Sequence, residues 1–166
     1  MTKIIGLDVS ENMVAEFNRK TLESRISAEK MFALKGNLLE ETIPEHLMGP
    51  DFFEFDIVAV SAAIHHFADA ELAMKRLGSR LKKGGIFFIL ELLADHHGEE
   101  ETQNFDPEAA HTVHKHGFRP DEMRELYVHA GLAENFDFQI VEKPFVFTLN
   151  GREFKKTIFM ARGERS

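Results

Sequence analysis

Two continuous apolar runs with a periodic segment between them dominate the middle of the chain. Ile57–Val60 and Ile86–Leu90 hold β-branched and aromatic residues without polar interruption, which is typical of strands covered on both faces. Between these runs, apolar residues recur at spacings of three and four, as on one face of a helix: Ala70, Ala73, Leu77 and Leu81. The pattern predicts a strand, a helix and a parallel strand joined by a right-handed crossover.

Residues at both ends of this predicted helix set its limits. Asp69 can cap the amino end, because its carboxylate accepts hydrogen bonds from the free backbone N–H groups there. The cationic pair Lys82–Lys83 suits the last turn, and the pair Gly84–Gly85 suits a helix stop. We therefore expect a helix that starts at Ala70 and continues to the lysine pair.

The segment before this unit predicts a strand, a helix, a second strand and a loop. Lys3–Val9 is an apolar strand, and Ser10 is a suitable N-cap for a helix that follows it. Phe32–Leu38 is the next expected strand, and the acidic residues 40–54, which include two prolines, predict a short helix and a loop. The first helix should bury an apolar face made of Met13, Val14, Phe17 and Leu22.

The segment after the central unit begins with a long polar stretch. Residues 94–118 lack a clear hydrophobic period, so they predict a loop that covers the site, with a helix around Pro107–His114. Pro120 then suits the first turn of another helix, and Gly131 suits its end.

The last part of the chain predicts strands. Phe136–Ile140 alternates between apolar and polar residues, as a half-buried strand does. Phe145–Leu149 and Thr157–Ala161 flank the dipeptide Asn150–Gly151, which favours a reverse turn. The sheet should therefore end in an antiparallel pair of strands.

Composition limits the class of protein. With 166 residues, 43% hydrophobic and 29% charged, the chain is expected to fold as a single domain over residues 1–166. A net charge of -8 argues against binding to nucleic acids or anionic membranes. The absence of cysteine excludes a disulfide framework and a thiolate nucleophile. We see no signal peptide and no apolar run long enough to span a membrane, so we expect a cytoplasmic protein.

Four segments resemble those of class I S-adenosylmethionine (SAM) dependent methyltransferases. They are GLDVSENMV from residue 6, FDIVAVSAAIHHFAD from residue 55, LKKGGIFFILE from residue 81 and HGFRPDEMRELYVHAGL from residue 116. In this order they resemble the family's second strand, its fourth strand with the turn after it, the approach to its fifth strand and the segment before its sixth strand. The resemblance implies an α/β fold: a Rossmann-like, mostly parallel sheet with helices on both faces and an antiparallel last strand. It also implies SAM as the cofactor.

The resemblance further implies which residues bind SAM. Asp8, at the end of its strand, would accept hydrogen bonds from the ribose hydroxyls, with Val9 beside it. The alternative is that Asp8 makes only a local turn bond. Asn37, next to Leu38, stands where the family usually has an acidic residue that contacts the adenine amino group, and an amide oxygen can also accept from it. The pair Ser61–Ala62 would line the methionine end of SAM.

Three histidines are candidate bases. His65 and His66 follow the central strand, and imidazole titrates near neutral pH. The alternative is that one packs against the sheet while the other bonds a loop carbonyl. His116 resembles a family position near the substrate. Glu91, which ends an apolar strand, needs a partner if buried, and we interpret it as a structural hydrogen-bonding carboxylate.

A metal site is not expected. Five histidines stand at 96, 97, 111, 114 and 116, but one helix cannot aim the last three at a single ion. No cysteine is available to complete a site. Methyl transfer itself needs mainly alignment, because the sulfonium is already a strong electrophile.

The family's first strand, its G-x-G-x-G turn and its first helix would precede Lys3–Val9, which this chain reaches directly after Met1. We therefore expect an N-terminally truncated three-layer sandwich. The strands Lys3–Val9 and Ile57–Val60 should then pair directly, giving one six-stranded sheet in the order 2-1-3-4-6-5. Without the glycine turn, SAM binding by this chain should be weak or absent.

The leading hypothesis is a SAM-dependent methyltransferase that acts on a small-molecule methyl acceptor, with no nucleic-acid or membrane partner. A homodimer is an open alternative to a monomer. The rival hypothesis is a non-catalytic, methyltransferase-like binding or scaffold protein. A third is another nucleotide-binding α/β protein.

Overall fold

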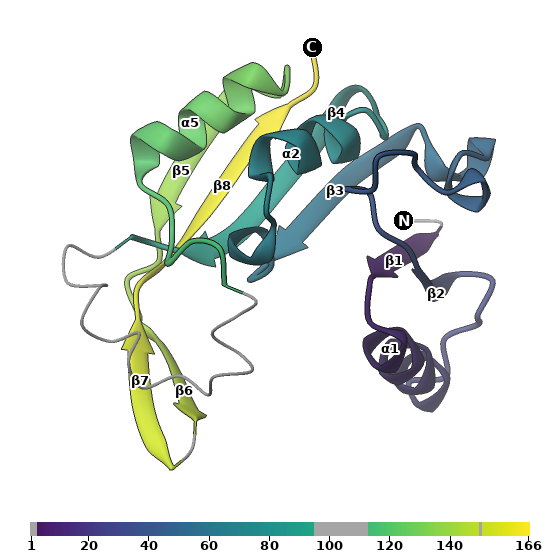
Figure 1. The fold of residues 1–166 in the computed structure, drawn as a ribbon, viewed down its shortest axis with the longest axis horizontal. Helices are drawn as coiled ribbons and strands as arrows, with labels where there is room; N and C mark the ends of the chain where they lie inside the picture. Colours follow the sequence, from purple (N-terminus) through teal and green to yellow (C-terminus); the bar gives the residue numbers. More distant parts are fainter. Residues whose placement is uncertain (1–2, 95–112, 150) are drawn as a thin grey trace. The chain divides into compact units, whose positions relative to one another are not determined.

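The computed structural model describes residues 3–94, 113–149 and 151–166. The chain forms two compact units, Met1–Pro50 and Asp51–Ser166, each with its own sheet (Figure 1). The helix that we expected around Pro107–His114 lies almost wholly outside the described residues.

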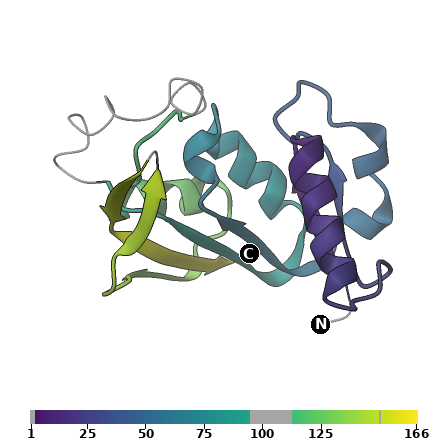
Figure 2. The same cartoon turned by 90° about the horizontal axis from the view of Figure 1, so that it is seen from below.

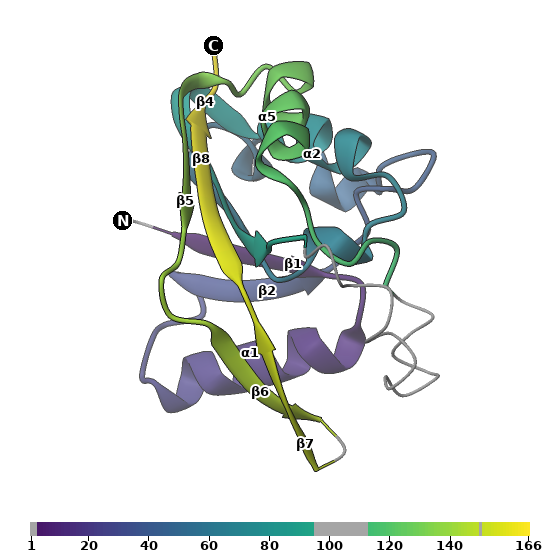
Figure 3. The ribbon, with the colours of Figure 1, turned by 90° about the vertical axis from the view of Figure 1, so that its left-hand side faces the viewer.

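In the first unit, two parallel strands carry one helix. Strands β1 (Ile4–Asp8) and β2 (Met31–Lys35) pair in parallel, and helix α1 (Glu11–Glu23) runs along them (Figure 3). Ser10 caps α1 as expected, because its hydroxyl accepts a hydrogen bond from the backbone of the first turn. The Asn18 amide holds the helix to β2, donating to the Ala33 carbonyl and accepting from its N–H (3.0 and 2.7 Å).

The apolar face predicted for α1 is partly wrong. Met13 and Leu22 are 59% and 65% exposed, whereas Thr21 is buried. The Thr21 hydroxyl can be buried because it donates to the carbonyl of Phe17, one turn earlier. The loop expected in residues 40–54 is confirmed, with two short 3-10 turns, Glu45–Leu47 and Pro50–Phe52.

In the second unit, a four-stranded mixed sheet has the order β3-β4-β8-β5. Its elements are β3 (Phe55–Ser61), α2 (Ala70–Gly78), β4 (Leu81–Leu92), α5 (Pro120–His129), β5 (Glu134–Ile140) and β8 (Ile158–Glu164). β3 and β4 lie side by side in parallel (Figure 2), while β8 is antiparallel to both of its neighbours. This is the order that we predicted for the second half of the sheet.

The two α-helices that the structure describes in the second unit, α2 and α5, lie on one face of its sheet (Figure 3). Alternate residues of β4, among them Phe87 and Ile89, point to this face and are fully buried. They form one core with Tyr127 of α5 and Phe159 of β8. The core fixes the register of the strands, because a shift by one residue would turn these side chains to the opposite face.

The predicted end of α2 is wrong. The helix stops at Gly78, and Leu81 already belongs to β4. At this end the N–H of Ser79 donates to the Lys75 carbonyl, and the N–H of Arg80 donates to the Leu77 carbonyl. Leu81 would suit an apolar position of the helix or of the strand. In the strand it is completely buried in the core beneath the helices. Gly85 lies within β4, and a β-carbon there would stand 2.9 Å from the Phe55 carbonyl oxygen, so this close approach requires glycine.

The predicted last pair of strands is also corrected. β6 (Phe145–Leu149) pairs with β7 (Arg152–Lys156) across a turn that contains Gly151 (φ 78°), and this hairpin extends beyond the main sheet (Figures 1 and 3). β8 is a separate strand that joins the main sheet. Its burial explains this choice, because Phe159 and Ala161 complete the core.

The single six-stranded sheet that we expected requires β1 to pair with β3 of the other unit, and it stays a prediction. The described strands make three separate ladders: β1-β2, β3-β4-β8-β5 and β6-β7.

Candidate functional site

The carboxyl ends of the parallel strands β3 and β4 meet at one edge of the second unit, where ligands bind in sheets of this kind. Ser61 pairs with Leu90 there, and the N–H of Ala62 donates to the Leu90 carbonyl (2.8 Å). Ala62 has a φ of 46°, in the left-handed region that non-glycine residues rarely adopt. Such strain concentrates at functional sites. Nothing in the sequence signals it.

A short 3-10 turn, Ile64–His66, follows Ala62 and carries two of the predicted bases. His65 is buried, and its Nδ1 lies 2.8 Å from Oε1 of Glu91 at the end of β4. The Glu91 side chain has no exposed surface, whereas 11% of the His65 side chain remains accessible. The partner that Glu91 was expected to need is therefore a histidine 26 residues earlier in the chain.

Backbone donors complete the surroundings of Glu91. The N–H of Leu92 donates to Oε1 (2.7 Å), and the N–H of His65 approaches Oε2 (3.4 Å). The carboxylate therefore accepts from two backbone groups and one ring, which satisfies a buried acceptor.

The other two predicted bases are exposed. The ring of His66 lies against that of His65, with centroids 4.0 Å apart and a tilt of 40°. His116 precedes Gly117, whose φ is 133° and whose β-carbon would stand 2.9 Å from the Leu92 carbonyl oxygen. Only glycine fits this contact, so the HGF segment docks on the end of β4 and brings His116 to the same edge.

The segment after residue 112 is also bonded to the histidine turn. The N–H groups of His114 and Lys115 both donate to the carbonyl of His65 (3.0 and 3.1 Å). Phe118 pairs with the end of β4 through an isolated bridge to Leu93. The turn, the strand end and this segment therefore form one connected backbone cluster.

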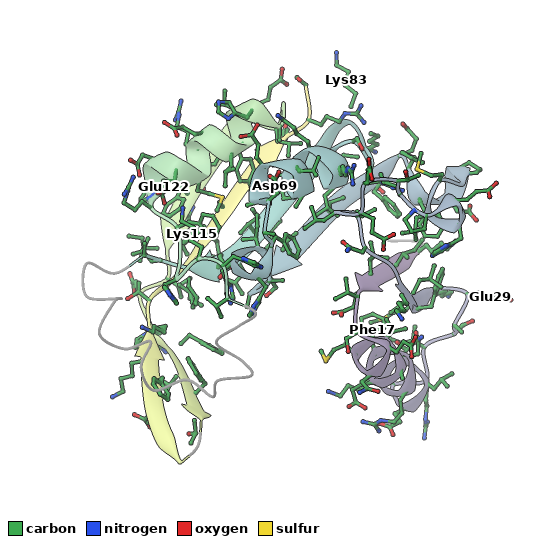
Figure 4. All side chains as sticks on the ribbon, in the orientation of Figure 1. Phe17, Glu29, Asp69, Lys83, Lys115 and Glu122 are labelled. Carbon is green, nitrogen blue, oxygen red and sulfur yellow. The ribbon has the colours of Figure 1, made fainter. Side chains whose placement is uncertain are left out.

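An open cavity of about 310 Å³ adjoins this cluster, between α2, α5 and the segment 114–118. Lys115 projects over the ring of Phe118, 4.6 Å from its centroid, and pairs with Glu122 (3.1 Å; Figure 4). Burial acts to raise the pKa of Glu122, but hydrogen bonds from the Arg119 N–H and the Lys115 ammonium outweigh it and hold the pKa below its usual value. Hydrogen bonds from Lys75 and His129 likewise lower the pKa of Glu71. No pattern in the sequence indicates this cavity.

In the first unit, the predicted SAM-binding residues lie at the carboxyl ends of β1 and β2. Oδ1 of Asp8 accepts from the N–H of Ser10 (2.8 Å), which is the local turn bond of the alternative interpretation. Oδ1 of Asn37 accepts from the N–H of Leu39 in the same way (2.8 Å). Val9 is 61% exposed and Leu38 is buried. The side-chain oxygens of Asp8 and Asn37 can each accept a further hydrogen bond from a ligand.

A metal centre is absent from the part of the chain that the structure describes: no group of three or more His, Cys, Asp or Glu residues there could hold an ion. His96, His97 and His111 lie outside that part. No helix among the described residues is both long and apolar enough to cross a membrane.

Comparison with known proteins decides the family. A family model described as a methyltransferase domain matches residues 1–87, more than half of the chain. The chain belongs to this methyltransferase family. The prediction of a class I SAM-dependent methyltransferase, with SAM as its cofactor, is confirmed at the level of the family.

A sequence relative and two solved structures agree with this assignment. An uncharacterised methyltransferase of Schizosaccharomyces pombe is 29% identical over 134 residues, which cover 79% of this chain and 46% of that protein. The chain thus spans about half the length of this relative.

The solved structures show the fold. The YcgJ protein of Bacillus subtilis gives a TM-score of 0.69 at 19% identity, over 99% of this chain and 83% of that one. A SAM-dependent methyltransferase of Thermotoga maritima, described as a possible histamine N-methyltransferase, gives 0.62 at 23% identity, over 98% and 72%. The predicted Rossmann-like α/β class is confirmed.

Proposed function

We propose that this chain transfers the methyl group of SAM to a small-molecule acceptor. The observation that carries the proposal is the edge beyond β3 and β4, where the strained Ala62, the buried His65 and the docked His116 converge. The adjoining cavity of about 310 Å³ has the size of small-molecule sites. The net charge of -8 disfavours a nucleic-acid acceptor.

SAM would supply the electrophilic methyl group, and residues of this chain would hold it. Asp8 would accept from the ribose hydroxyls through the oxygen that Ser10 does not use, with Val9 beside it. Asn37 and Leu38 would contact the adenine. Ser61 and Ala62 would line the methionine end.

The acceptor side would be formed by His65, His66 and His116. Alignment of the acceptor with the methyl–sulfur bond provides much of the rate, because the sulfonium needs no further activation. A homodimer and a cytoplasmic location also stay predictions from the sequence.

The rival function is a non-catalytic binding protein of methyltransferase ancestry. It draws support from the turn bonds that already engage Asp8 and Asn37. The two functions differ in whether methyl transfer occurs.

The test is a transfer assay with radiolabelled SAM and a panel of small hydroxyl and amine acceptors, together with calorimetry of SAM binding. If calorimetry detects SAM binding, Asp8→Ala should weaken it by about 1.5–3 kcal/mol, the range for hydrogen bonds to a charged group. Asp56→Ala, which removes an exposed carboxylate paired with Lys82, is the matched control and should not change the affinity. Binding without transfer to any acceptor would favour the rival, and equal affinities would remove Asp8 from the site.

A further inference from the structure

The contact between Glu91 and His65 fixes where the imidazole carries its proton. An ionised carboxylate can only accept hydrogen bonds, so Nδ1, at 2.8 Å from Oε1, must be the protonated nitrogen of a neutral ring. The N–H of Leu92 donates to the same oxygen, Oε1, so this oxygen acts as an acceptor in both contacts. The tautomer of His65 is thus set by a group with no exposed surface.

The second nitrogen of the ring is placed by the same contact. With Nδ1 protonated, the lone pair of the neutral imidazole is on Nε2, at the edge of the ring away from Glu91. The N–H groups of His114 and Lys115 donate to the His65 carbonyl, so the backbone that carries the ring is held in place. The His65 side chain keeps 11% of its surface accessible.

We infer that Glu91 is a positioning residue that holds His65 as the Nδ1–H tautomer, and that Nε2 takes the proton of the methyl acceptor. The acceptor is then a protic nucleophile, a hydroxyl or an N–H amine. This inference rests on the proposed function. It changes the role of Glu91 from the purely structural one that the sequence suggested.

The lone pair of the acceptor oxygen or nitrogen forms the bond to the methyl carbon, while the carbon–sulfur bond breaks and its electron pair stays on sulfur as a neutral thioether. The acceptor proton moves to Nε2. The imidazolium that results lies beside the Glu91 carboxylate, which stabilises its charge, and then releases the proton to water.

The tautomer can be measured without substrate. Long-range ¹⁵N–¹H spectra of the ¹⁵N-labelled chain, with the His65 ring assigned by its loss in His65→Gln, should show the Nδ1–H form. Glu91→Gln should give a mixture of tautomers, because an amide can accept from Nδ1–H or donate to Nδ1. An Nε2–H ring in the wild-type chain, or an unchanged ring in Glu91→Gln, would overturn the inference.

Kinetics test the second half of the inference. With a hydroxyl or amine acceptor, His65→Gln should lower kcat about 100-fold, and Glu91→Gln should lower kcat by a smaller factor with KM unchanged. Glu91→Asp keeps the charge and should recover part of the loss. Glu164→Gln, which changes a partly buried carboxylate paired with Arg162 at the other end of the sheet, is the control and should keep the wild-type kcat.

The two proposals fail in different ways. Absence of methyl transfer by the wild-type chain would reject the proposed function, and the spectra would still decide whether Glu91 sets the tautomer. Methyl transfer that keeps its kcat in His65→Gln would reject the inference alone. Thermal melts of each variant show whether the fold is kept.

Discussion

At the scale of single residues, Tyr127 shows how one polar atom joins the helix layer to the sheet. Its hydroxyl lies within hydrogen-bonding distance of the carbonyl oxygens of Phe87 (3.2 Å) and Ala161 (3.1 Å), on two neighbouring strands. Its ring packs edge-on against those of Phe87 and Phe136. Burial raises the pKa of the Tyr127 hydroxyl above its ordinary value.

This burial predicts how stability depends on pH. In the unfolded chain Tyr127 ionises at pH ~10, and in the folded chain its pKa is higher. Its contribution is therefore complete below pH ~10 and is lost as the pH rises above that value. Tyr127→Phe should lower the free energy of unfolding by about 1 kcal/mol at neutral pH, and the difference from wild type should shrink in alkali. Urea unfolding of both proteins at neutral pH and in alkali measures the difference in the free energy of unfolding.

The chain has one tyrosine and no tryptophan, so tyrosinate absorbance reports this residue alone. The absorbance should rise only together with loss of the circular dichroism signal. Ionisation near pH ~10 in a chain that remains folded would contradict the burial of Tyr127.

At the scale of elements, the end of α5 passes very close to β8. A β-carbon on Gly163 would lie 2.0 Å from the Leu132 carbonyl oxygen and 2.8 Å from Cδ1 of Tyr127. Leu132 follows α5 and is fully buried. The Tyr127 ring is also fully buried and packs edge-on against Phe87. Glycine is therefore required at this crossing of helix layer and sheet.

We predict that Gly163→Ala destabilises the chain by about 3 kcal/mol, the upper part of the range for overpacked sites, because a backbone oxygen must move. Gly49→Ala is the matched control: a β-carbon there meets no atom within 4 Å, so stability should stay within about 0.5 kcal/mol of wild type. Urea denaturation midpoints give both values. Equal midpoints for the two variants would show that the helix end shifts freely.

At the scale of the whole molecule, the principal core belongs to one unit. The buried cluster runs from Val60 to Ala161 and includes no residue of Met1–Pro50. The single domain that we expected from length therefore stays a prediction. One calorimetric transition for the full chain would support it.

We predict that the purified chain holds no stoichiometric zinc or iron. It has no cysteine, and the histidines at 111, 114 and 116 cannot converge from one helix. Elemental analysis measures the metal content, and addition of a chelator should leave the melting temperature unchanged. One tightly held equivalent of metal would overturn this prediction.

The sequence by itself determined the features that depend on neighbours along the chain. Ser10 and Asp69 cap their helices as expected, and Pro120 begins α5, because a cap acts within one turn. The apolar runs at Ile57–Val60 and Ile86–Leu90 both lie in strands. The four matching segments also sufficed to indicate the family.

Tertiary structure alone decided features that depend on segments far apart in the chain. Leu81 suits a helix or a strand, and the shared core selected the strand. Glu91 clearly needed a partner, but its identity follows from the register that places Ser61 beside Leu90. That register is set by which side chains the helices bury, a condition that no local pattern contains.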